Sequence, residues 1–275
     1  MISAAGSGWS LTNGDCIAGM RLLADKSVDV TISDPPYEAE AHTKGRRTKT
    51  GTSTTRSAGK GDWKSRVARG EAVASAAPLP FAAITECERT DSASEIARLT
   101  RRWALVFCQV EAAGSWAAAL EVGGLDYVRT MVWIKPDAQP QFTGDRPGHG
   151  YESIVVAHRK GRKRWNGGGR VGVFTHCRAR PGSPGGPGSE PSPHPTTKPL
   201  ALMAELVSLF SDPGELVLDP FAGSGSTGVA CGQLGRRFQG FELDAGYYEI
   251  ACRRLRGEAA RINPAQPDLF GSVTP

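Results

Sequence analysis

The segment that most restricts the fold of this chain is a short apolar strand that ends in an acid and runs into a glycine-rich turn. It reads Leu216-Val217-Leu218-Asp219-Pro220-Phe221-Ala222-Gly223-Ser224-Gly225, and a helix-like sequence begins at Ser226. Glycines in such a turn allow a ligand close to the backbone, and the N–H groups of the following helix face that ligand. The segment therefore predicts an α/β domain with a ligand crevice at the carboxyl end of a strand.

The rest of the chain alternates strand-like and helix-like patterns, which predicts a mainly parallel, twisted sheet with helices on both faces. The predicted strands are 28–33, 104–109, 128–134, 153–157, 215–218 and 238–241. The predicted helices are 16–23, 92–102, 112–120, 199–210, 226–234 and 245–256. A length of 275 residues fits one large domain that carries insertions.

The glycine turn by itself leaves two cofactor classes open. Gly223, Gly225 and Gly228 satisfy the GxGxxG pattern of dinucleotide-binding proteins, and Glu242 follows 19 residues after Gly223. An acid that binds ribose hydroxyls beside a glycine turn serves NAD and S-adenosylmethionine equally well. A nicotinamide-dependent oxidoreductase is therefore one of the two alternatives at this point.

A second segment distinguishes these alternatives. Asp34, Pro35, Pro36 and Tyr37 directly follow the predicted strand 28–33. The Asp34 carboxylate and the Pro35 carbonyl can both accept hydrogen bonds from one NH₂ group. Tyr37 offers a ring face on which a planar base can stack. These residue types predict a site that binds the exocyclic amine of a nucleic-acid base.

With both segments present, the chain resembles the amino-group DNA methyltransferases. In that family a DPPY motif, here 34–37, binds the amine, and an FxGxG motif, here 221–225, binds S-adenosylmethionine. DPPY precedes FxGxG, as in the β group of the family, whose motif order is circularly rearranged. The resemblance implies a Rossmann-like S-adenosylmethionine-dependent methyltransferase fold and a reaction that requires no metal.

Other segments extend the resemblance along the chain. Residues 14–16 are similar to the family's GDC segment near the adenine of the cofactor, and 194–199 resemble the HPTQKP segment at its methionine end. Residues 133–136 and 151–154 look like the WxKP and (H/N)E segments. The resemblance implies catalytic roles for Asp34, Pro35, Pro36 and Tyr37. It implies cofactor-binding roles for Asp15, Cys16, Asp34, Thr196, Thr197, Lys198, Asp219, Phe221, Ala222, Gly223, Ser224, Gly225, Glu242 and Leu243.

Charge is distributed very unevenly along the chain. Residues 42–69 and 159–180 each carry a formal charge of +8, whereas the whole chain carries +5, so the remainder is acidic. Basic segments on an acidic body are typical of a surface that binds phosphate groups. The residues expected to bind substrate DNA are Lys44, Arg46, Arg47, Lys49, Lys135, Arg162, Lys163 and Arg164.

These observations predict a single methyltransferase domain over 1–275. It would contain a basic insertion at 38–90 for DNA contact, a basic and Pro/Gly-rich linker at 159–195, a cofactor-binding half at 196–258 and a flexible tail at 259–275. The expected reaction is site-specific transfer of a methyl group to N6 of a flipped-out adenine in double-stranded DNA, of the restriction-modification kind. Alternatives are an N4-cytosine methyltransferase, an NAD-dependent oxidoreductase and a DNA-binding module without catalysis.

Three further expectations concern partners and location. Residues 266–270 look like the peptide by which bacterial proteins bind the replication sliding clamp, and the resemblance also admits a homodimer. No apolar run reaches the length of a membrane span, and the amino end lacks a basic segment followed by an apolar one, so we expect a cytoplasmic protein. The six cysteines are scattered without metal-ligand spacing, so no zinc site is expected.

Overall fold

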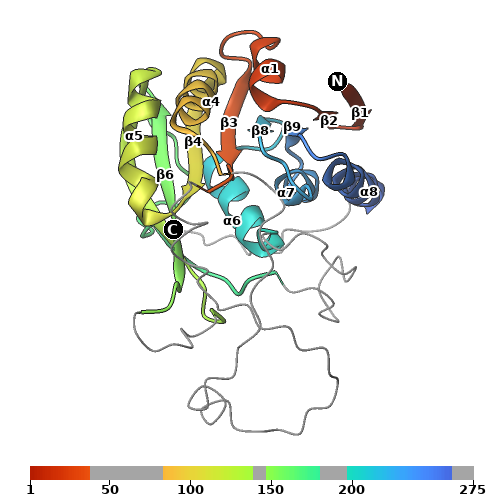
Figure 1. The fold of residues 1–275 in the computed structure, drawn as a ribbon. Helices are drawn as coiled ribbons and strands as arrows, with labels where there is room; N and C mark the ends of the chain where they lie inside the picture. Colours follow the sequence, from red (N-terminus) through yellow and green to blue (C-terminus); the bar gives the residue numbers. More distant parts are fainter. Residues whose placement is uncertain (38–82, 139–146, 180–196, 262–275) are drawn as a thin grey trace, which may run out of the picture.

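The computed structural model describes residues 1–37, 83–138, 147–179 and 197–261. Within these residues nine strands form one sheet in the order β1-β2-β9-β8-β3-β4-β6-β5-β7 (Figure 1). The strands are β1 (Ile2–Gly6), β2 (Trp9–Asn13), β3 (Val28–Ser33), β4 (Thr100–Cys108), β5 (Leu125–Ile134), β6 (Tyr151–Arg159), β7 (Val173–Thr175), β8 (Leu216–Asp219) and β9 (Arg237–Glu242). The helices are α1 (Cys16–Arg21), α4 (Glu86–Leu99), the 3₁₀ turn η1 (Val110–Ala112), α5 (Ala113–Val122), α6 (Leu200–Phe210), α7 (Ser226–Gln233) and α8 (Ala245–Arg261).

Most of the described strands run in one direction. β1 and β6 are the exceptions, because β1 pairs antiparallel with β2, and β6 pairs antiparallel with both β4 and β5. The carboxyl ends of the parallel strands therefore share one edge of the sheet, and the amino end of β6 lies at that same edge. Every residue that follows a parallel strand is brought to this edge.

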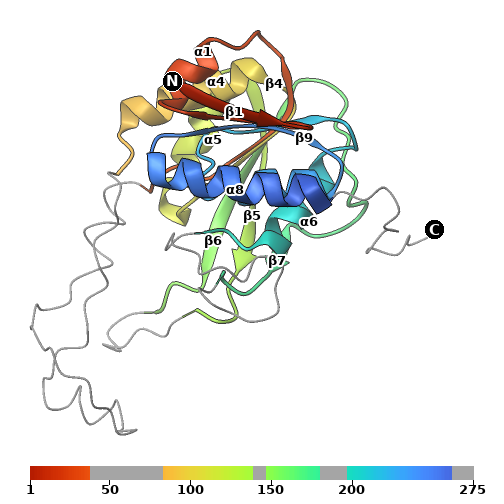
Figure 2. The same cartoon turned by 90° about the vertical axis from the view of Figure 1, so that its right-hand side faces the viewer.

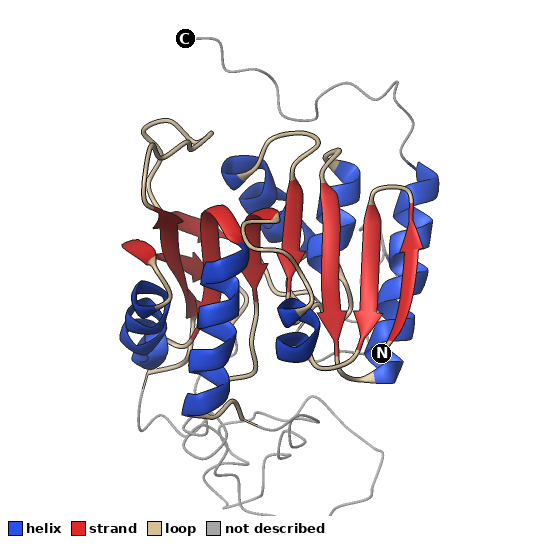
Figure 3. Ribbon diagram, turned by 90° about the horizontal axis from the view of Figure 1, so that it is seen from above, coloured by secondary structure: helices blue, strands red, loops and turns tan. Residues whose placement is uncertain are grey.

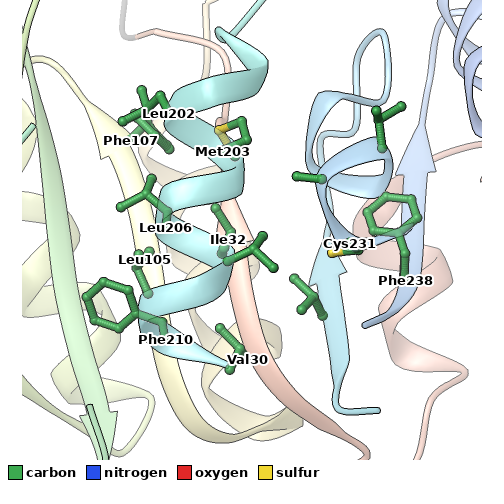
Figure 4. Close-up of a cluster of buried hydrophobic side chains, with 14 of the residues drawn as sticks. Val30, Ile32, Leu105, Phe107, Leu202, Met203, Leu206, Phe210, Cys231 and Phe238 are labelled. Atoms are coloured by element: carbon green, nitrogen blue, oxygen red, sulfur yellow. The ribbon is translucent and has the colours of Figure 1, made fainter. Parts of the chain in front are cut away.

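Helices cover both faces of the sheet, as Figure 3 shows from above. β4 illustrates the reason, since successive side chains of a strand point to opposite faces. Trp103, Leu105 and Phe107 pack in a cluster with side chains of α6, α7 and α8. Figure 4 shows Leu105 and Phe107 beside α6 in this cluster. A central strand buried on both sides explains the continuous apolar sequence of β4.

The opposite face of the sheet carries α1, α4 and α5. Ala104, Val106 and Cys108 of β4 belong to a second buried cluster that includes Ile96 of α4 and Trp116 of α5. On the face covered by α6 and α7, α8 lies alongside β1 and β9 (Figure 2). The core thus has two halves separated by the sheet, and both are built from the alternation of side chains along the central strands.

The predicted helix 92–102 is wrong at both ends. The helix α4 begins at Glu86, where Thr85 and Glu88 form a capping box that binds the first free N–H groups of the helix. It ends at Leu99, and the chain continues directly into β4, whose first residue Thr100 is buried. Sequence reasoning also missed β1, β2 and β7, which are short or contain small residues.

Three predicted segment boundaries also differ from the structure. Residues 83–90, placed in the basic insertion, belong to the described fold, because Ile84 is buried and α4 begins at Glu86. The predicted linker 159–195 contains β7, which pairs in parallel with β5 and buries Phe174. The predicted tail from 259 begins inside α8, which extends to Arg261.

Among the helices of the described residues, none combines the length and apolar character that a membrane crossing requires.

Candidate active site

The order of the strands produces a crevice between β3 and β8. From β3 the chain goes on to β4 on one side, and from β8 it goes on to β9 on the other side. Loops that diverge in this way leave room for a ligand at the carboxyl ends of the two strands. Thr31 of β3 pairs in register with Leu218 of β8, so Asp34 and Asp219 both lie at this edge.

A cavity of about 630 Å³ occupies the crevice, which is within the usual range for sites that bind small molecules. Both turns singled out in the sequence line it. Among the predicted site residues, its wall contains Asp15, Cys16, Asp34, Pro35, Pro36, Tyr37, Thr197, Lys198, Asp219, Phe221, Ala222, Gly223, Ser224, Glu242 and Leu243. Thr196 lies outside the described residues. The structure therefore brings the turn 34–37 and the glycine turn to one cavity.

The glycine turn is held by two acids. Asp219 accepts hydrogen bonds from the Phe221 N–H at 3.1 Å and from the Thr227 hydroxyl at 2.5 Å. Glu242, at the end of β9, accepts from the Gly223 N–H at 2.7 Å. Acids at the ends of two neighbouring strands thus fix the backbone of the turn that joins β8 to α7.

Gly223 and Gly225 are required in this turn for different reasons. Both have a positive φ, +53° at Gly223 and +81° at Gly225, which disfavours other residues. A Cβ on Gly223 would meet no atom within 4 Å, whereas one on Gly225 would lie 3.0 Å from the Cβ of Ala251 in α8. Gly223 therefore keeps the cavity side open, and Gly225 allows α8 to approach the turn.

The far end of the cavity is formed by the residues that follow β2. Asp15 caps α1 by accepting a hydrogen bond from the Ala18 N–H at 2.7 Å. Burial raises the pKa of the Cys16 thiol to about 12, so this side chain is an uncharged part of the wall. Leu243 is 74% exposed and lies at the rim.

The Asp34 side chain has one oxygen engaged and one available. Lys198 donates from its Nζ to Asp34 Oδ2 at 2.5 Å. Within the described part of the chain, Asp34 Oδ1 is buried and has no hydrogen-bond partner. A buried acceptor without a partner is unfavourable in a folded protein unless a ligand supplies a donor. The arrangement therefore leaves an acceptor oxygen in a turn that lines the cavity.

Glu152 completes the polar part of the site, although the sequence analysis gave it no role. Its Oε1 accepts from the Tyr37 hydroxyl at 2.8 Å and also from Lys135. Its Oε2 lies 3.3 Å from Lys198 Nζ. Glu152 comes from the amino end of the antiparallel strand β6, so only the sheet topology brings it to Tyr37.

Burial and pairing shift the pKa values of these groups in definite directions. Burial raises the pKa of Asp34, although the adjacent Lys198 opposes this shift. Burial also disfavours ionisation of Glu152, but Lys198 and Lys135 hold its pKa down at about 2. The two carboxylates outweigh the effect of burial on Lys198 and raise its pKa well above the ordinary value. Lys198 is therefore a permanent cation between the carboxylates of Asp34 and Glu152.

The residues predicted to bind DNA fall into three groups. Lys44, Arg46, Arg47 and Lys49 lie outside the described residues. Lys135 follows β5, but its ammonium group is bound to Glu152 and the side chain is only 12% exposed.

The third group, Arg162, Lys163 and Arg164, lines a separate hollow together with Arg102 and Glu215. Arg102 is near the start of β4, and Glu215 directly precedes β8. The hollow therefore lies at the amino ends of the parallel strands, at the edge of the sheet opposite Asp34. Arg164 forms an ion pair with Asp212 at 3.2 Å in this region.

In the described ranges, no group of three or more histidine, cysteine or acidic side chains is arranged to hold a metal ion.

The sequence is similar to known DNA methyltransferases. Residues 173–253 match a family model described as DNA methylase. The Type II methyltransferase M.Cfr9I of Citrobacter freundii is 31% identical over 157 residues, which are 53% of this chain and 50% of that protein. This chain thus spans about half the length of the curated relatives it matches.

The structure is similar to solved methyltransferase structures over nearly its whole length. The crystal structure of the M1.HpyAVI–SAM complex matches with a TM-score of 0.61 and 23% identity, over 90% of this chain and 98% of that one. The cytosine-N4-specific PvuII DNA methyltransferase matches with a TM-score of 0.65 and 13% identity, over 91% and 87%. These similarities confirm the predicted α/β fold of the S-adenosylmethionine-dependent methyltransferases.

Proposed function

We propose that this chain transfers a methyl group from S-adenosylmethionine to N6 of adenine in double-stranded DNA, a reaction suggested by its similarity to DNA methyltransferases. One observation carries the proposal. The turn with a free carboxylate oxygen and the glycine turn line the same cavity, so an amine bound at one would face a methyl donor bound at the other.

The residues of the glycine side suit S-adenosylmethionine. Glu242 would bind the ribose hydroxyls, Asp15 lies at the end of the cavity suited to the adenine, and the open space above Gly223 suits close approach to the backbone. Thr197 and Ser224, whose hydroxyls are 3.3 Å apart, line the wall beside Lys198. When bound, S-adenosylmethionine would supply a methyl group on a positively charged sulfur. The sulfur–methyl bond would break as the nitrogen–methyl bond forms, S-adenosylhomocysteine would leave, and the amine nitrogen would release one proton to solvent.

The protein's own residues would position the amine. Asp34 Oδ1 and the Pro35 carbonyl accept its two hydrogens, so that the nitrogen lone pair is directed toward the methyl group. This is catalysis by orientation and electrostatics more than by proton abstraction. A base within a duplex cannot reach such a buried acceptor, so it must flip out, at the cost of a few kcal/mol, and stack on Tyr37.

An aspartate at the first position of this turn favours adenine, since N4-cytosine enzymes of the family more often have serine there. N4 of cytosine is the second candidate, because the same carboxylate and carbonyl can accept from either exocyclic amine.

The basic insertion is the segment we assign to DNA contact. It follows directly on Tyr37, and the Ile84 N–H on its far side donates to the Tyr37 carbonyl at 3.2 Å. The described residues on either side of 38–82, Tyr37 and Ile84, both line the cavity, and this supports a role in DNA contact for Lys44, Arg46, Arg47 and Lys49. The site of action would be the compartment that holds DNA, for which the sequence predicts the cytoplasm.

The proposal is tested by incubating the purified chain with isotopically labelled S-adenosylmethionine and unmethylated double-stranded DNA, with RNA as the control substrate. The nucleic acid is then hydrolysed to nucleosides and analysed by mass spectrometry. Labelled N6-methyladenine from DNA is the expected product. Labelled N4-methylcytosine would show that cytosine, and not adenine, is the substrate base. If neither nucleic acid yields a labelled nucleoside, the proposed activity is overturned.

A further inference from the structure

Four charged side chains form a buried cluster at the catalytic end of the cavity. Asp34 and Glu152 contribute carboxylates, and Lys198 and Lys135 contribute ammonium groups. The exposed fractions are 22% for Asp34, 10% for Glu152, 6% for Lys198 and 12% for Lys135. Charged groups at such depth destabilise a fold unless they are paired. The cluster contains two positive and two negative charges, so its net charge is zero.

Glu152 is the member of this cluster that contacts both halves of the amine-binding turn. Its Oε1 holds the Tyr37 hydroxyl at 2.8 Å. Its Oε2 is 3.3 Å from Lys198 Nζ, and Lys198 holds Asp34 Oδ2 at 2.5 Å. One carboxylate is therefore linked to the ring that would stack on the base and, through Lys198, to the acid that would accept the amine.

We propose that Glu152 is a positioning residue for methyl transfer, which fixes the Tyr37 ring and keeps Lys198 on one oxygen of Asp34 so that the other oxygen stays available to the amine. The inference rests on the proposed function, because it assigns Glu152 to the same reaction. In Glu152→Gln the amide oxygen can still accept from the Tyr37 hydroxyl, but the negative charge beside Lys198 Nζ is lost, so Lys198 retains a single carboxylate partner. The ring and the acid are then free to move relative to each other.

The position of Glu152 also has an electrostatic consequence for Asp34. The charged groups that act on Asp34 are Lys198 from the segment before α6, Glu152 from β6 and Lys135 from the end of β5. Asp219 of β8 adds a further acid on the other side. Glu152 is the carboxylate that, with burial, raises the pKa of Asp34. Removing its charge should therefore lower the pKa of Asp34. Loosening of the site would also relieve burial and lower this pKa, but it would weaken S-adenosylmethionine binding as well.

The test compares Glu152→Gln with Glu215→Gln. Glu215 is also partly buried and paired with an arginine, Arg102, but it lies at the opposite edge of the sheet. For Glu152→Gln we expect kcat to fall about 10- to 100-fold while the KM for S-adenosylmethionine changes less than about 3-fold. The acidic limb of the pH profile of kcat should move to lower pH. Glu215→Gln should show neither effect.

A second measurement does not depend on catalysis. The ¹³C resonance of the Asp34 carboxyl group, assigned by its loss in Asp34→Asn, is titrated in the protein without DNA. Its midpoint should fall to lower pH in Glu152→Gln and stay in place in Glu215→Gln.

The outcomes separate this inference from the proposed function. The inference alone is overturned if the unsubstituted chain transfers methyl groups and Glu152→Gln leaves either the titration midpoint of Asp34 or kcat unchanged. A chain that methylates no DNA yet shows the shifted carboxyl titration overturns the proposed function, while the coupling of Glu152 to Asp34 is upheld.

Discussion

The Gly223 N–H donates to Glu242 Oε2 over 2.7 Å, which fastens the glycine turn after β8 to the acid after β9. The other oxygen of Glu242 accepts from the Asp244 N–H at 2.8 Å, at the start of α8. The residue expected to bind the ribose therefore also fixes the turn over which the cofactor would lie. Its loss should affect ligand affinity through direct contacts and through the shape of the turn.

Replacing Glu242 with alanine should weaken S-adenosylmethionine binding by about 10- to 100-fold, because hydrogen bonds to a charged acceptor contribute roughly 1.5–3 kcal/mol. Isothermal titration calorimetry measures the change. Glu242→Gln, which retains an acceptor oxygen, should lose less affinity than Glu242→Ala. An unaltered dissociation constant in the alanine variant would contradict the role given to Glu242.

Asp34→Asn should separate catalysis from cofactor binding. The amide can no longer present a charged acceptor to the amine, so methyl transfer should fall by about 100- to 1000-fold, as when one preorganised contact to the reacting group is removed. Affinity for S-adenosylmethionine should stay within about 3-fold of the original value. On the same preparation, single-turnover kinetics give the rate of methyl transfer and calorimetry gives the dissociation constant for S-adenosylmethionine. Equal losses in both would mean that Asp34 acts mainly in cofactor binding.

Because of Asp219, the free energy of unfolding should fall as the pH rises. Burial raises its pKa to about 7 in the folded protein, whereas an aspartate in an unfolded chain has a pKa of about 3.9. The unfolded state therefore gives up its proton first, and the folded state loses stability between about pH 4 and pH 7.

Asp219→Asn removes this titration and keeps an oxygen that can accept from the Phe221 N–H. Between pH 5 and pH 8 the variant should gain about 2–3 kcal/mol in unfolding free energy relative to the original protein. Urea denaturation at the two pH values measures the difference. If the variant and the original protein differ in unfolding free energy by the same amount at pH 5 and at pH 8, Asp219 is ionised throughout this range.

Gly225→Ala should destabilise the protein more than Gly214→Ala. Both glycines have nearly the same positive φ, +81° and +82°, so both variants incur the same backbone penalty, roughly 1 kcal/mol. Only at Gly225 does the new Cβ meet another atom, the Cβ of Ala251 at 3.0 Å. Thermal unfolding of the two variants isolates the contact between the glycine turn and α8. Equal melting temperatures would show that α8 can withdraw without loss of stability.

Neutralising Arg162, Lys163 and Arg164 together should leave kcat unchanged within about 2-fold, because these residues lie at the edge of the sheet opposite Asp34. We propose that these three residues contact DNA phosphates, so the KM for DNA should rise in the variant. The slope of log affinity against log salt concentration should become less steep by up to about 3. Affinity measured over a range of salt concentrations tests this. An unchanged slope would exclude phosphate contacts by all three.

The sequence predicted the two turns well because each consists of consecutive residues with restricted backbone chemistry. Asp34-Pro35-Pro36-Tyr37 and the glycine turn line one cavity, as their places after two strands suggested. The extent of α4 was wrong because Thr100-Arg101-Arg102 can continue a helix locally. Pairing with β3 and β6 makes these residues the start of β4.

The roles of Lys198 and Glu152 could not be read from the sequence in the same way. The resemblance implied a place for Lys198 near the methionine end of the cofactor. The structure places Lys198 on the cavity wall and also shows its ammonium group bound to Asp34, a contact that the sequence did not predict. Glu152 reaches Tyr37 only through the pairing of β5 with β6, in which it lies opposite Trp133. Contacts between residues more than 100 positions apart depend on strand register, which local patterns do not specify.

The antiparallel direction of β6 makes the site sensitive to an otherwise minor change in length. Consecutive residues of a strand point to opposite faces, so a slip of one position reverses every side chain. A single residue inserted directly after Glu152 in β6 would turn its side chain away from Tyr37 and place a neighbour in its position. A one-codon insertion there should disable the reaction centre while every motif residue is still present.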